Sequence, residues 1–330
     1  MEDIILKIDN VSKRFTLPSN AIDRLVSRIT KQPLNDTVHA VSQISVEVKK
    51  GEVLGIVGES GCGKSTLGRI ISGIYTPSDG NVTLNGQPVA QFRDGRVVKA
   101  TTKVQMIHQD PFASLNPRMR IGEQISEGPV KNGIIHKSDA ANRVQELLQQ
   151  VGLNPSYANR FPHQFSGGQR QRIAIARALA MEPDILVFDE AVASLDVSIQ
   201  AQVLNLFMDL RKKLNLTAIF ISHDLSVVRH VCDRVAIMYL GRMVELAGSE
   251  DLHKQRYHPY SQALYSAIPE LGKEKGEFNP VIGEIPSPLS PPSGCAFHPR
   301  CPIAQPICSK QYPETTTVDG RRFACHVLNK

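Results

Sequence analysis

Long apolar runs are missing from this chain of 330 residues. No stretch reaches the about 18 consecutive apolar residues that a membrane-spanning helix needs, so we expect no transmembrane helix. The first residues, MEDIILKIDN, also lack the basic start and the small-residue cleavage site of a secretory signal. We therefore expect a soluble chain that reaches a membrane only through partner proteins.

Clusters of basic residues are also missing. The formal net charge is +6, but Lys and Arg are scattered along the chain and no DNA- or RNA-binding motif is present. This pattern indicates a solvated surface, and we expect no nucleic-acid partner. A chain of this length fills one large domain or two smaller ones and can bury a substantial core.

A phosphate-binding loop is the first motif that the chain does contain. Residues 58–65 follow the pattern Gly-x-x-x-x-Gly-Lys-Ser, after an apolar run (EVLGIV) typical of a buried parallel strand and before a helical pattern (TLGRIISGI). The glycines let backbone N–H groups close around phosphate oxygens, and the helix N-terminus adds a favourable dipole. A chance match is the alternative, and the strand–loop–helix context argues against it. The expected nucleotide-binding residues are Gly58, Glu59, Ser60, Gly61, Cys62, Gly63, Lys64, Ser65 and Thr66.

Polar side chains follow three further apolar runs, which end at residues 107, 188 and 221. Ligands of open α/β sheets bind beyond the carboxyl ends of the strands, so these side chains are expected to face the nucleotide. Lys64 would contact the β- and γ-phosphates, while Ser65 and, through water, Asp189 would hold Mg²⁺. Glu190 has no metal to neutralise it and fits the base that orients the attacking water. A solvated acidic turn is the alternative for the two acids.

Two more strand-end residues complete the expected catalytic set. His223 would contact the γ-phosphate, although a lone histidine is more often structural than functional. Gln109 could contact both Mg²⁺ and the attacking water. The expected catalytic residues are therefore Glu190, His223 and Gln109.

The segment FSGGQRQRIAIARAL (165–179) is much rarer than a phosphate loop. With the loop upstream, it resembles the signature of ABC transporter ATP-binding subunits. The resemblance implies that Ser166, Gly167, Gly168 and Gln169 bind the γ-phosphate of a nucleotide held by an opposing subunit, so that two chains enclose two nucleotides. It further implies that Asp196, in ASLD, belongs to a loop linking the two sites, and that Phe15 stacks on adenine.

This resemblance also implies the fold and its subdivision. We expect an α/β P-loop NTPase core, with the ABC nucleotide-binding domain over residues 1–250. Its helical subdomain, which faces the permease, should cover about 111–180. A short basic amphipathic insertion (19–38) interrupts the first sheet. Soluble ABC ATPases of translation or DNA repair usually carry two cassettes or a coiled-coil insertion. No internal repeat or such insertion is visible in this sequence, which disfavours that class.

Residues 251–330 form an extension rich in Pro and Cys. RYHPYSQALYSAIP and GEIPSPLSPPSGCAFHPRCPIAQPIC resemble the tail of oligopeptide and dipeptide importer ATPases. Nine of the 21 prolines fall between residues 280 and 313, so we expect an extended, irregular segment rather than a second folded domain.

Four of the six cysteines lie in this extension, at Cys295, Cys301, Cys308 and Cys325. Disulfides are disfavoured in a cytosolic ATPase, and the spacings do not match the tight Cys-x-x-Cys of zinc sites. Thiolates at wider spacings can hold an iron–sulfur cluster. The resembled family carries a [4Fe–4S] centre in such a tail, so we expect this cluster, with Zn²⁺ as the alternative. Nucleotide binding should survive its loss, because the extension was expected to lie apart from the phosphate-loop core.

The function implied by the resemblance is ATP hydrolysis that energises peptide import at the cytoplasmic face of the membrane. The implied partners are two transmembrane permease subunits, an extracytoplasmic solute-binding protein and a second ATPase subunit, often a non-identical paralogue. Related importers move nickel, glutathione, opines or sugars, so these solutes stay as alternatives. A soluble ATP-driven switch without a permease is the alternative of a different class.

Overall fold

Two sheets form the body of the molecule, and helices pack between them and on the outer face of the larger one. The computed structural model describes residues 3–17, 37–93, 95–266 and 283–328. Most of the basic insertion expected at 19–38 lies outside these ranges; Thr37 and Val38 begin a strand. None of the helices within the described ranges has the length and apolar character that crossing a bilayer requires.

The smaller sheet is antiparallel. It contains β1 (Ile4–Thr16), β2 (Thr37–Lys49), β4 (Asp79–Leu84) and β5 (Gln87–Pro88), in the order β2-β1-β4-β5. Buried residues in β1 and β2 alternate with exposed ones along much of each strand, as expected when one face packs on a core and the other faces water. This sheet therefore covers one side of the molecule.

The larger sheet has a parallel centre. Its order is β13-β14-β12-β11-β3-β10-β9-β8, and the pairs from β11 to β8 are all parallel. These five strands are β3 (Val53–Val57), β8 (Val104–Ile107), β9 (Ile185–Asp189), β10 (Thr217–Ile221) and β11 (Arg234–Tyr239). Every residue of β3, β9 and β10 is buried, which explains why these strands read as uninterrupted apolar runs.

Helix α2 (Lys64–Ile71) packs between the two sheets, with Leu67, Ile70 and Ile71 in a core shared with both. A Cβ atom at Gly68 would lie 2.6 Å from the Cδ1 of Ile221, so a larger residue here would displace the end of that side chain. Helices on the other face belong to a second core. They are α7 (Val197–Leu214), α8 (Leu225–Val231) and α9 (Ser249–Lys254).

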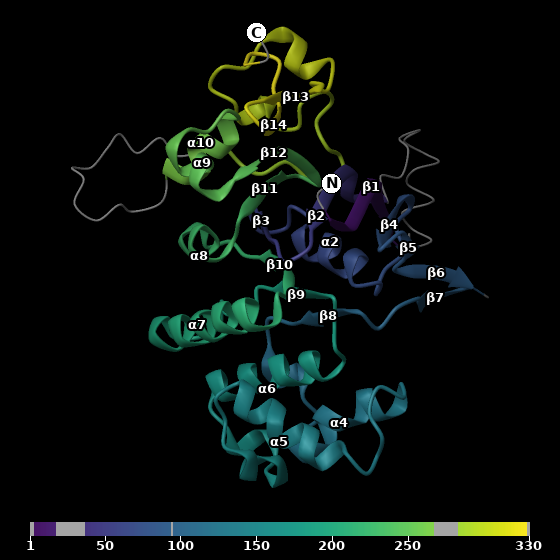
Figure 1. Cartoon of the computed structure of the whole chain (residues 1–330). Coiled ribbons are helices and arrows are strands. Elements are labelled where there is room, and N and C mark those ends of the chain that lie inside the picture. The colour runs from purple at the N-terminus through teal and green to yellow at the C-terminus, as the bar shows by residue number, and fades with distance from the viewer. Residues whose placement is uncertain (1–2, 18–36, 94, 267–282, 329–330) are drawn as a thin grey trace, which may run out of the picture.

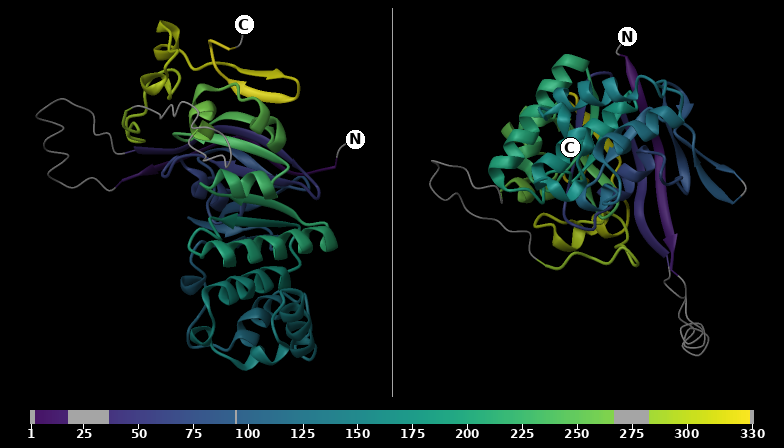
Figure 2. Two further views of the ribbon diagram at one scale, coloured as in Figure 1. Left: turned by 90° about the vertical axis from the view of Figure 1, so that its left-hand side faces the viewer. Right: turned by 90° about the horizontal axis from the view of Figure 1, so that it is seen from below.

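The segment between β8 and β9 is helical, as the sequence predicts. It contains α3 (Pro111–Ser114), α4 (Ile121–Lys131), α5 (Ala140–Gln150), η1 (Pro155–Asn159), η2 (Pro162–Gln164) and α6 (Gly167–Ala180). Figure 1 shows this subdomain at the end of the molecule opposite the C-terminal residues, with α6 next to the core. The side view in Figure 2 shows the same stacking. A hairpin of β6 (Ala90–Arg93) and β7 (Arg96–Lys99) projects between the two parts.

The C-terminal extension does not lie apart from the core, and the prediction that it would is wrong. Strand β12 (Arg242–Gly248) pairs with β11 on one side and with β14 (Arg321–Ala324) on the other. β14 in turn pairs with β13 (Thr315–Val318), so both strands belong to the main sheet. The physical reason is the edge of β12, whose unpaired backbone groups are satisfied by the extension.

The remaining extension is only partly regular. Residues 283–297 contain no helix or strand, as the proline content predicts. Among the described residues that follow α9, three short helices occur, namely α10 (Pro259–Ser266), η3 (His298–Arg300) and η4 (Pro306–Ser309). The buried carboxylate of Glu245, in β12, accepts the N–H groups of Tyr257 and His258, both at 2.9 Å. This contact holds the start of α10 against the sheet.

Candidate active site

The phosphate loop lies tightly against the neighbouring backbone. Gly58 and Gly63 have φ angles of 155° and 103°. A Cβ atom would lie 2.2 Å from the carbonyl oxygen of Met238 at the first position and 2.0 Å from that of Ala40 at the second. Glycine is therefore required at both ends of the loop by conformation and by space.

Lys64 begins α2, and its side chain folds back over the loop. The Nζ atom donates to the carbonyl oxygens of Gly58 at 2.8 Å and of Glu59 at 3.0 Å. The residue is only 4% exposed. These bonds hold a buried ammonium group inside the loop, at the N-terminus of a helix, where an anionic phosphate is favoured.

The Ser65 hydroxyl donates to the Oδ1 atom of Asp189 at 2.7 Å. Asp189 ends β9 and is 6% exposed, so the strand-end acid and the loop hydroxyl meet as the sequence predicts. Hydroxyl and carboxylate oxygens suit Mg²⁺, which takes few protein ligands and completes its shell with water and substrate phosphates. In the described part of the chain, no three His, Cys, Asp or Glu side chains are grouped to hold a metal on their own.

Glu190 and His223 come together from neighbouring strand ends. The Oε2 atom of Glu190 lies 3.4 Å from the Nδ1 atom of His223. The backbone N–H of Glu190 donates to the carbonyl of Ile221 at 3.0 Å, and its φ angle is 50°. This left-handed conformation is uncommon outside glycine and is typical of residues held in place for function. The Glu190 side chain keeps one-fifth of its surface exposed, so water can reach it.

A cavity of about 410 Å³ joins many of the predicted residues. It is lined by Phe15, Val38, Ala40, Ser60, Gly61, Gly63, Lys64, Ser65, Thr66, Gln109, Glu190 and Pro288. Phe15 packs edge-on against Tyr75, with ring centroids 5.6 Å apart, and is half-buried at the rim. The cavity thus collects the loop, the expected adenine-stacking ring and two of the three expected catalytic residues. Asp189 and His223 lie next to it through Ser65 and Glu190.

The loop that carries Asp196 lies close to Gln109. The Ser194 hydroxyl donates to the backbone carbonyl of Gln109 at 3.3 Å. Asp196 itself is exposed and is the N-cap residue of α7. The two loops that follow β8 and β9 are therefore joined at the surface.

The signature residues lie outside this cavity. Ser166 is the N-cap of α6 and forms a capping box with Gln169, since each side chain accepts the backbone N–H of the other, at 3.4 and 3.1 Å. Ser166 and Gly167 are exposed, while Gly168 is buried beside Ile199. Within one chain, the structure does not bring the signature to the phosphate loop.

Sequence reasoning missed the contacts that the extension makes with the loop. Pro288 lines the cavity, and Arg300 pairs with Glu59. The charge of Glu59 within a glycine-rich loop and the lone arginine in FHPRC were the available signals. Sequence separation hid their proximity, because the two residues are 241 positions apart.

The four cysteines of the extension are free thiols gathered in one region. The backbone N–H of Cys295 donates to the carbonyl of Cys308 at 2.8 Å. Burial, together with the nearby Cys308, Cys301 and Cys325, raises the pKa of Cys295 to about 11. The donor set is that of a thiolate centre, but among the residues described no three of these groups are arranged as metal ligands.

The other two cysteines are buried in the core. Cys62 belongs to the phosphate loop, and burial raises the pKa of its thiol. Cys232 is the C-cap residue of α8 rather than part of the helix, and burial raises its pKa as well. Both side chains are therefore packing thiols in the protonated form.

Two family descriptions match the chain. Residues 41–193 match the ABC transporter family, and residues 244–308 match the oligopeptide/dipeptide transporter C-terminal region. The first range contains the phosphate loop, the signature and the strand-end acids. The second contains Arg300 and three of the four clustered cysteines.

Characterised relatives are similar over nearly the whole length. The oligopeptide transport ATP-binding protein AppF of Bacillus subtilis (strain 168) is 47% identical over 333 residues, covering 99% of this chain and 98% of AppF. The di/tripeptide transport ATP-binding protein DppF of Pseudomonas aeruginosa (strain UCBPP-PA14) is 47% identical over 290 residues, or 88% of this chain and 90% of DppF.

Solved structures share the fold. CbiO1 of Clostridium perfringens, part of the ABC transporter complex cbiONQ, superposes with a TM-score of 0.62 at 29% identity and covers 77% of this chain and 92% of its own. The ATP-binding cassette MJ0796, in a dimeric post-hydrolysis state bound to ADP and Pi, gives 0.57 at 25% identity, with 74% and 99% covered. The predicted P-loop α/β core with a helical subdomain is thereby confirmed. This chain belongs to the ATP-binding subunits of the oligopeptide/dipeptide ABC transporter family.

Proposed function

We propose that this chain hydrolyses ATP to energise the import of peptides through a membrane complex. One observation supports the proposal: the loop lysine, the Ser65–Asp189 pair and the Glu190–His223 pair lie in or beside one cavity, and their chemistry suits phosphate, Mg²⁺ and an attacking water. We assign residues 1–250 to the nucleotide-binding domain and 251–330 to the extension.

The hydrolysis chemistry follows from these positions. Lys64 and the loop N–H groups bind the phosphates and neutralise their charge. Ser65 and, through water, Asp189 would hold Mg²⁺, which would supply further charge neutralisation. Glu190 accepts a hydrogen bond from the attacking water and orients it, and Gln109 lies on the same cavity. His223, whose Nδ1 atom lies 3.4 Å from the Glu190 carboxylate, helps to position that carboxylate and contacts the γ-phosphate.

The exposed signature indicates that the working site is shared between two chains. Ser166 and Gly167 are exposed at the N-terminus of α6, where the helix dipole favours an anionic ligand. In the proposed dimer this ligand is the γ-phosphate of the nucleotide bound by the opposing ATPase subunit. That subunit is a non-identical paralogue, and Asp196 lies at the contact between them.

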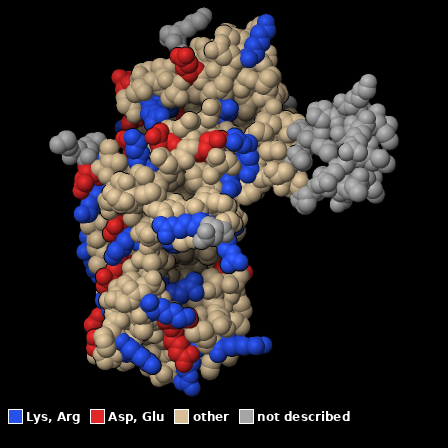
Figure 3. Space-filling view, turned by 90° about the vertical axis from the view of Figure 1, so that its right-hand side faces the viewer, with Lys and Arg blue, Asp and Glu red and all other residues tan. Residues whose placement is uncertain are grey.

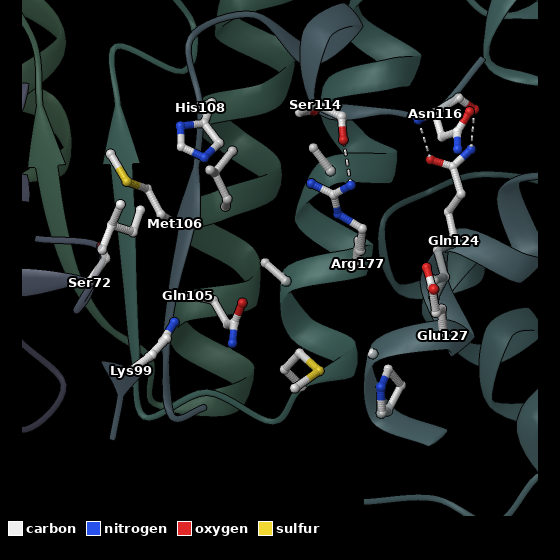
Figure 4. A pocket seen from close by; sticks show the side chains of 18 of the residues that line it. Ser72, Lys99, Gln105, Met106, His108, Ser114, Asn116, Gln124, Glu127 and Arg177 are labelled. Carbon is white, nitrogen blue, oxygen red and sulfur yellow. Dashed lines mark hydrogen bonds between the residues drawn. The ribbon is translucent and has the colours of Figure 1, made fainter. Parts of the chain in front are cut away.

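A cleft between the core and the helical subdomain is the proposed docking site of the permeases. The cleft is about 530 Å³ in volume, and Lys and Arg side chains surround a hollow on this face of the molecule (Figure 3). Figure 4 shows Lys99, His108 and Arg177 around it. Burial lowers the pKa of each of these three groups.

The basic side chains of the cleft suit a permease segment that carries hydrogen-bond acceptors, such as carboxylates. Arg177 donates to the carbonyl of Ser114 at 2.5 Å, and Gln124 bonds the backbone of Asn116 on both sides, so the walls are already ordered. Basic groups that have lost part of their hydration gain most from a carboxylate or the C-terminal end of a helix. One of the two permease subunits would place such a segment in this cleft and so hold the ATPase at the cytoplasmic face of the membrane.

Peptides are the proposed solute because the relatives named above are oligopeptide and di/tripeptide transport proteins. The ATPase does not contact the solute, so specificity resides in the permeases and the extracytoplasmic solute-binding protein. Nickel, glutathione, opines and sugars are the alternative solutes.

We propose further that the four cysteines of the extension hold a [4Fe–4S] cluster, with Zn²⁺ as the alternative. Support comes from four free thiols in one region, close enough to shift the pKa of Cys295. The centre would serve structure or regulation, because hydrolysis needs no electron.

The direct test is reconstitution. The chain, a paralogous ATPase and two permease subunits are placed in liposomes with the solute-binding protein. We expect ATP hydrolysis to rise when the binding protein carries a peptide, and labelled peptide to accumulate. Hydrolysis that is unchanged by permeases and binding protein would favour a switch without transport. Accumulation of Ni²⁺ or a sugar in place of peptide would contradict the proposed solute but not the proposed role in ATP-driven import.

A further inference from the structure

Glu59, in the phosphate loop, has a partner for each of its polar groups. Its carboxylate accepts two hydrogen bonds from the Arg300 guanidinium, at 2.8 Å and 3.0 Å. Its backbone N–H donates to the Tyr260 hydroxyl at 2.9 Å, and its carbonyl accepts the Lys64 ammonium at 3.0 Å. Glu59 thus joins the lysine of the loop to two side chains of the C-terminal extension.

The Arg300–Glu59 pair is largely removed from solvent. Only 6% of the Arg300 side chain and 23% of the Glu59 side chain are exposed. The guanidinium also donates to the Tyr239 hydroxyl at 3.3 Å, while its Nε atom is buried with no hydrogen-bond partner. Removing one partner of a buried ion pair leaves the other charge uncompensated and is strongly destabilising. Arg300 and Glu59 therefore hold each other in place. The two-pronged geometry additionally fixes the orientation of the carboxylate.

Aromatic packing holds Arg300 in this place. Tyr239 of β11, Tyr260 of α10 and Phe297 of the extension lie in mutual contact, with ring centroids 4.8 to 5.4 Å apart. All three rings are at most 1% exposed. Phe297 immediately precedes η3, the short helix that ends at Arg300. The position of the guanidinium is therefore set by a rigid cluster rather than by a free side chain.

The extension also meets the loop from a second side. The carbonyl of Pro288 accepts the N–H of His39 at 3.0 Å, and Pro288 lines the nucleotide cavity. A smaller cavity, of about 240 Å³, lies between residues 285–288 and loop residues 59–62. The loop is thus held between the sheet and the extension.

We infer that Arg300 is a positioning residue for ATP binding. By holding Glu59 it fixes the backbone of residues 58–60, and with it the carbonyl groups that orient the Lys64 ammonium. ATP affinity then depends on the folded state of the extension, including the segment between Cys295 and Cys301 in which Arg300 lies. The inference rests on the proposed function, since it takes the loop to be the ATP site.

The test is a double-mutant cycle on nucleotide affinity. All variants are made in the full-length Glu190→Gln chain, so that ATP is bound but not consumed, and binding of ATP with Mg²⁺ is measured by calorimetry. Arg300→Met and Glu59→Gln should each raise the Kd about tenfold, and the double variant should raise it no further than the larger single effect. Arg300→Lys, which keeps the charge but loses the second prong, should give an intermediate Kd.

Arg321→Met is the matched control. Arg321 forms an ion pair with Asp251 in the same extension, at 3.4 Å, and its side chain is 14% exposed. We expect it to lower the melting temperature as Arg300→Met does but to leave the Kd for ATP unchanged. Arg300→Met with an unchanged Kd, or additive effects of Arg300→Met and Glu59→Gln, would overturn the inference. A parent chain that binds no ATP would defeat the proposed function instead.

Discussion

Glu190 has a strained backbone conformation, and its carboxylate contacts His223. Its φ angle of 50° costs on the order of 1–3 kcal/mol in a residue other than glycine. The N–H bond to Ile221 holds this conformation, which aims the carboxylate at His223 and at the cavity. A carboxylate held in one orientation beside the phosphate loop suits the proposed role of Glu190 as the base, because it would not have to reorient during the reaction.

Glu190→Gln should separate chemistry from binding. The amide keeps the shape of the side chain but loses the basic oxygen, so turnover should fall by about 100-fold or more while ATP still binds. Lys64→Ala should lose affinity as well, because the ammonium contacts phosphate in ground and transition states alike. Phosphate release and ATP Kd measure the two effects. Comparable steady-state turnover in wild type and Glu190→Gln would remove Glu190 from its assigned role.

His258 makes the stability of the extension depend on pH. It is 1% exposed, and burial lowers its pKa to about 3 from an ordinary 6.5. As the pH falls, this histidine is protonated in the unfolded chain near pH 6.5 but in the folded chain only near pH 3. The folded chain therefore loses stability as the pH falls from about 6.5 toward 3. Between pH 7 and pH 5 this group alone should cost about 2 kcal/mol of unfolding free energy. Glu245 acts in the opposite direction. Burial raises the pKa of its carboxyl, so its contribution to the stability of the folded chain is lost as the pH rises above 4.5.

His258→Asn isolates the histidine from this opposing acid. The asparagine can still accept the Tyr260 N–H, which bonds the His258 Nδ1 atom at 3.1 Å. The unfolding free energy from denaturant titrations should then change less between pH 7 and pH 5 than in wild type. His136→Asn, at an exposed site, should leave the slope as it is. A slope equal to wild type in His258→Asn would place the acid sensitivity elsewhere.

At the scale of elements, the N-terminus of α6 and the phosphate loop are separated within one chain. Ser166→Arg should abolish turnover yet leave ATP binding by the same chain intact, since Ser166 does not line the nucleotide cavity. Mixed with a paralogue whose own phosphate-loop lysine is replaced by Ala, it should recover part of the turnover, because the site built from this chain's loop and the paralogue's signature is then complete. Each variant alone is the control. No recovery on mixing would indicate that the signature acts within its own chain.

The extension is the second element with a testable role. Protein purified without oxygen should be brown and contain about four irons per chain, and Cys301→Ser with Cys308→Ser should remove the colour. Zinc in place of iron would favour the alternative, and neither metal would defeat both. The same double substitution should also weaken ATP binding, because this segment positions Arg300 against Glu59. Cys232→Ala, which removes a buried thiol outside the extension, should spare both colour and affinity.

At the scale of the whole molecule, one chain supplies half of each proposed site. The purified chain should therefore hydrolyse ATP poorly until its paralogue is added. A titration of one ATPase with the other, monitored by phosphate release, should reach its maximum at equal amounts. Full activity of the isolated chain would show that the non-identical partner is not required.

The core was predictable because its signals are local. Buried parallel strands must be apolar along their whole length, so β3, β9 and β10 are visible as runs, and the polar residues that follow them mark the strand ends. Parallel alignment then brings Asp189, Glu190 and His223 to one edge, as predicted. The helical segment between β8 and β9 was predicted from the family resemblance, and the structure contains it.

The extension was harder to place because its contacts are non-local. Proline content correctly indicates an irregular stretch at 283–297, but no pattern within the sequence shows that β14 completes the edge of β12. Glu59 and Arg300 are each ordinary in isolation. Their pairing depends on an aromatic cluster drawn from three separate elements.

The sequence by itself determined the family and the fold of the core, and it located the candidate nucleotide-binding residues, since these depend on short motifs whose backbone requirements are local. Only the tertiary structure decided that the extension belongs to the main sheet and contacts the phosphate loop. The reason is physical: a buried ion pair forms where packing excludes water and brings two charges together. Packing between residues 241 positions apart is a property of the whole fold.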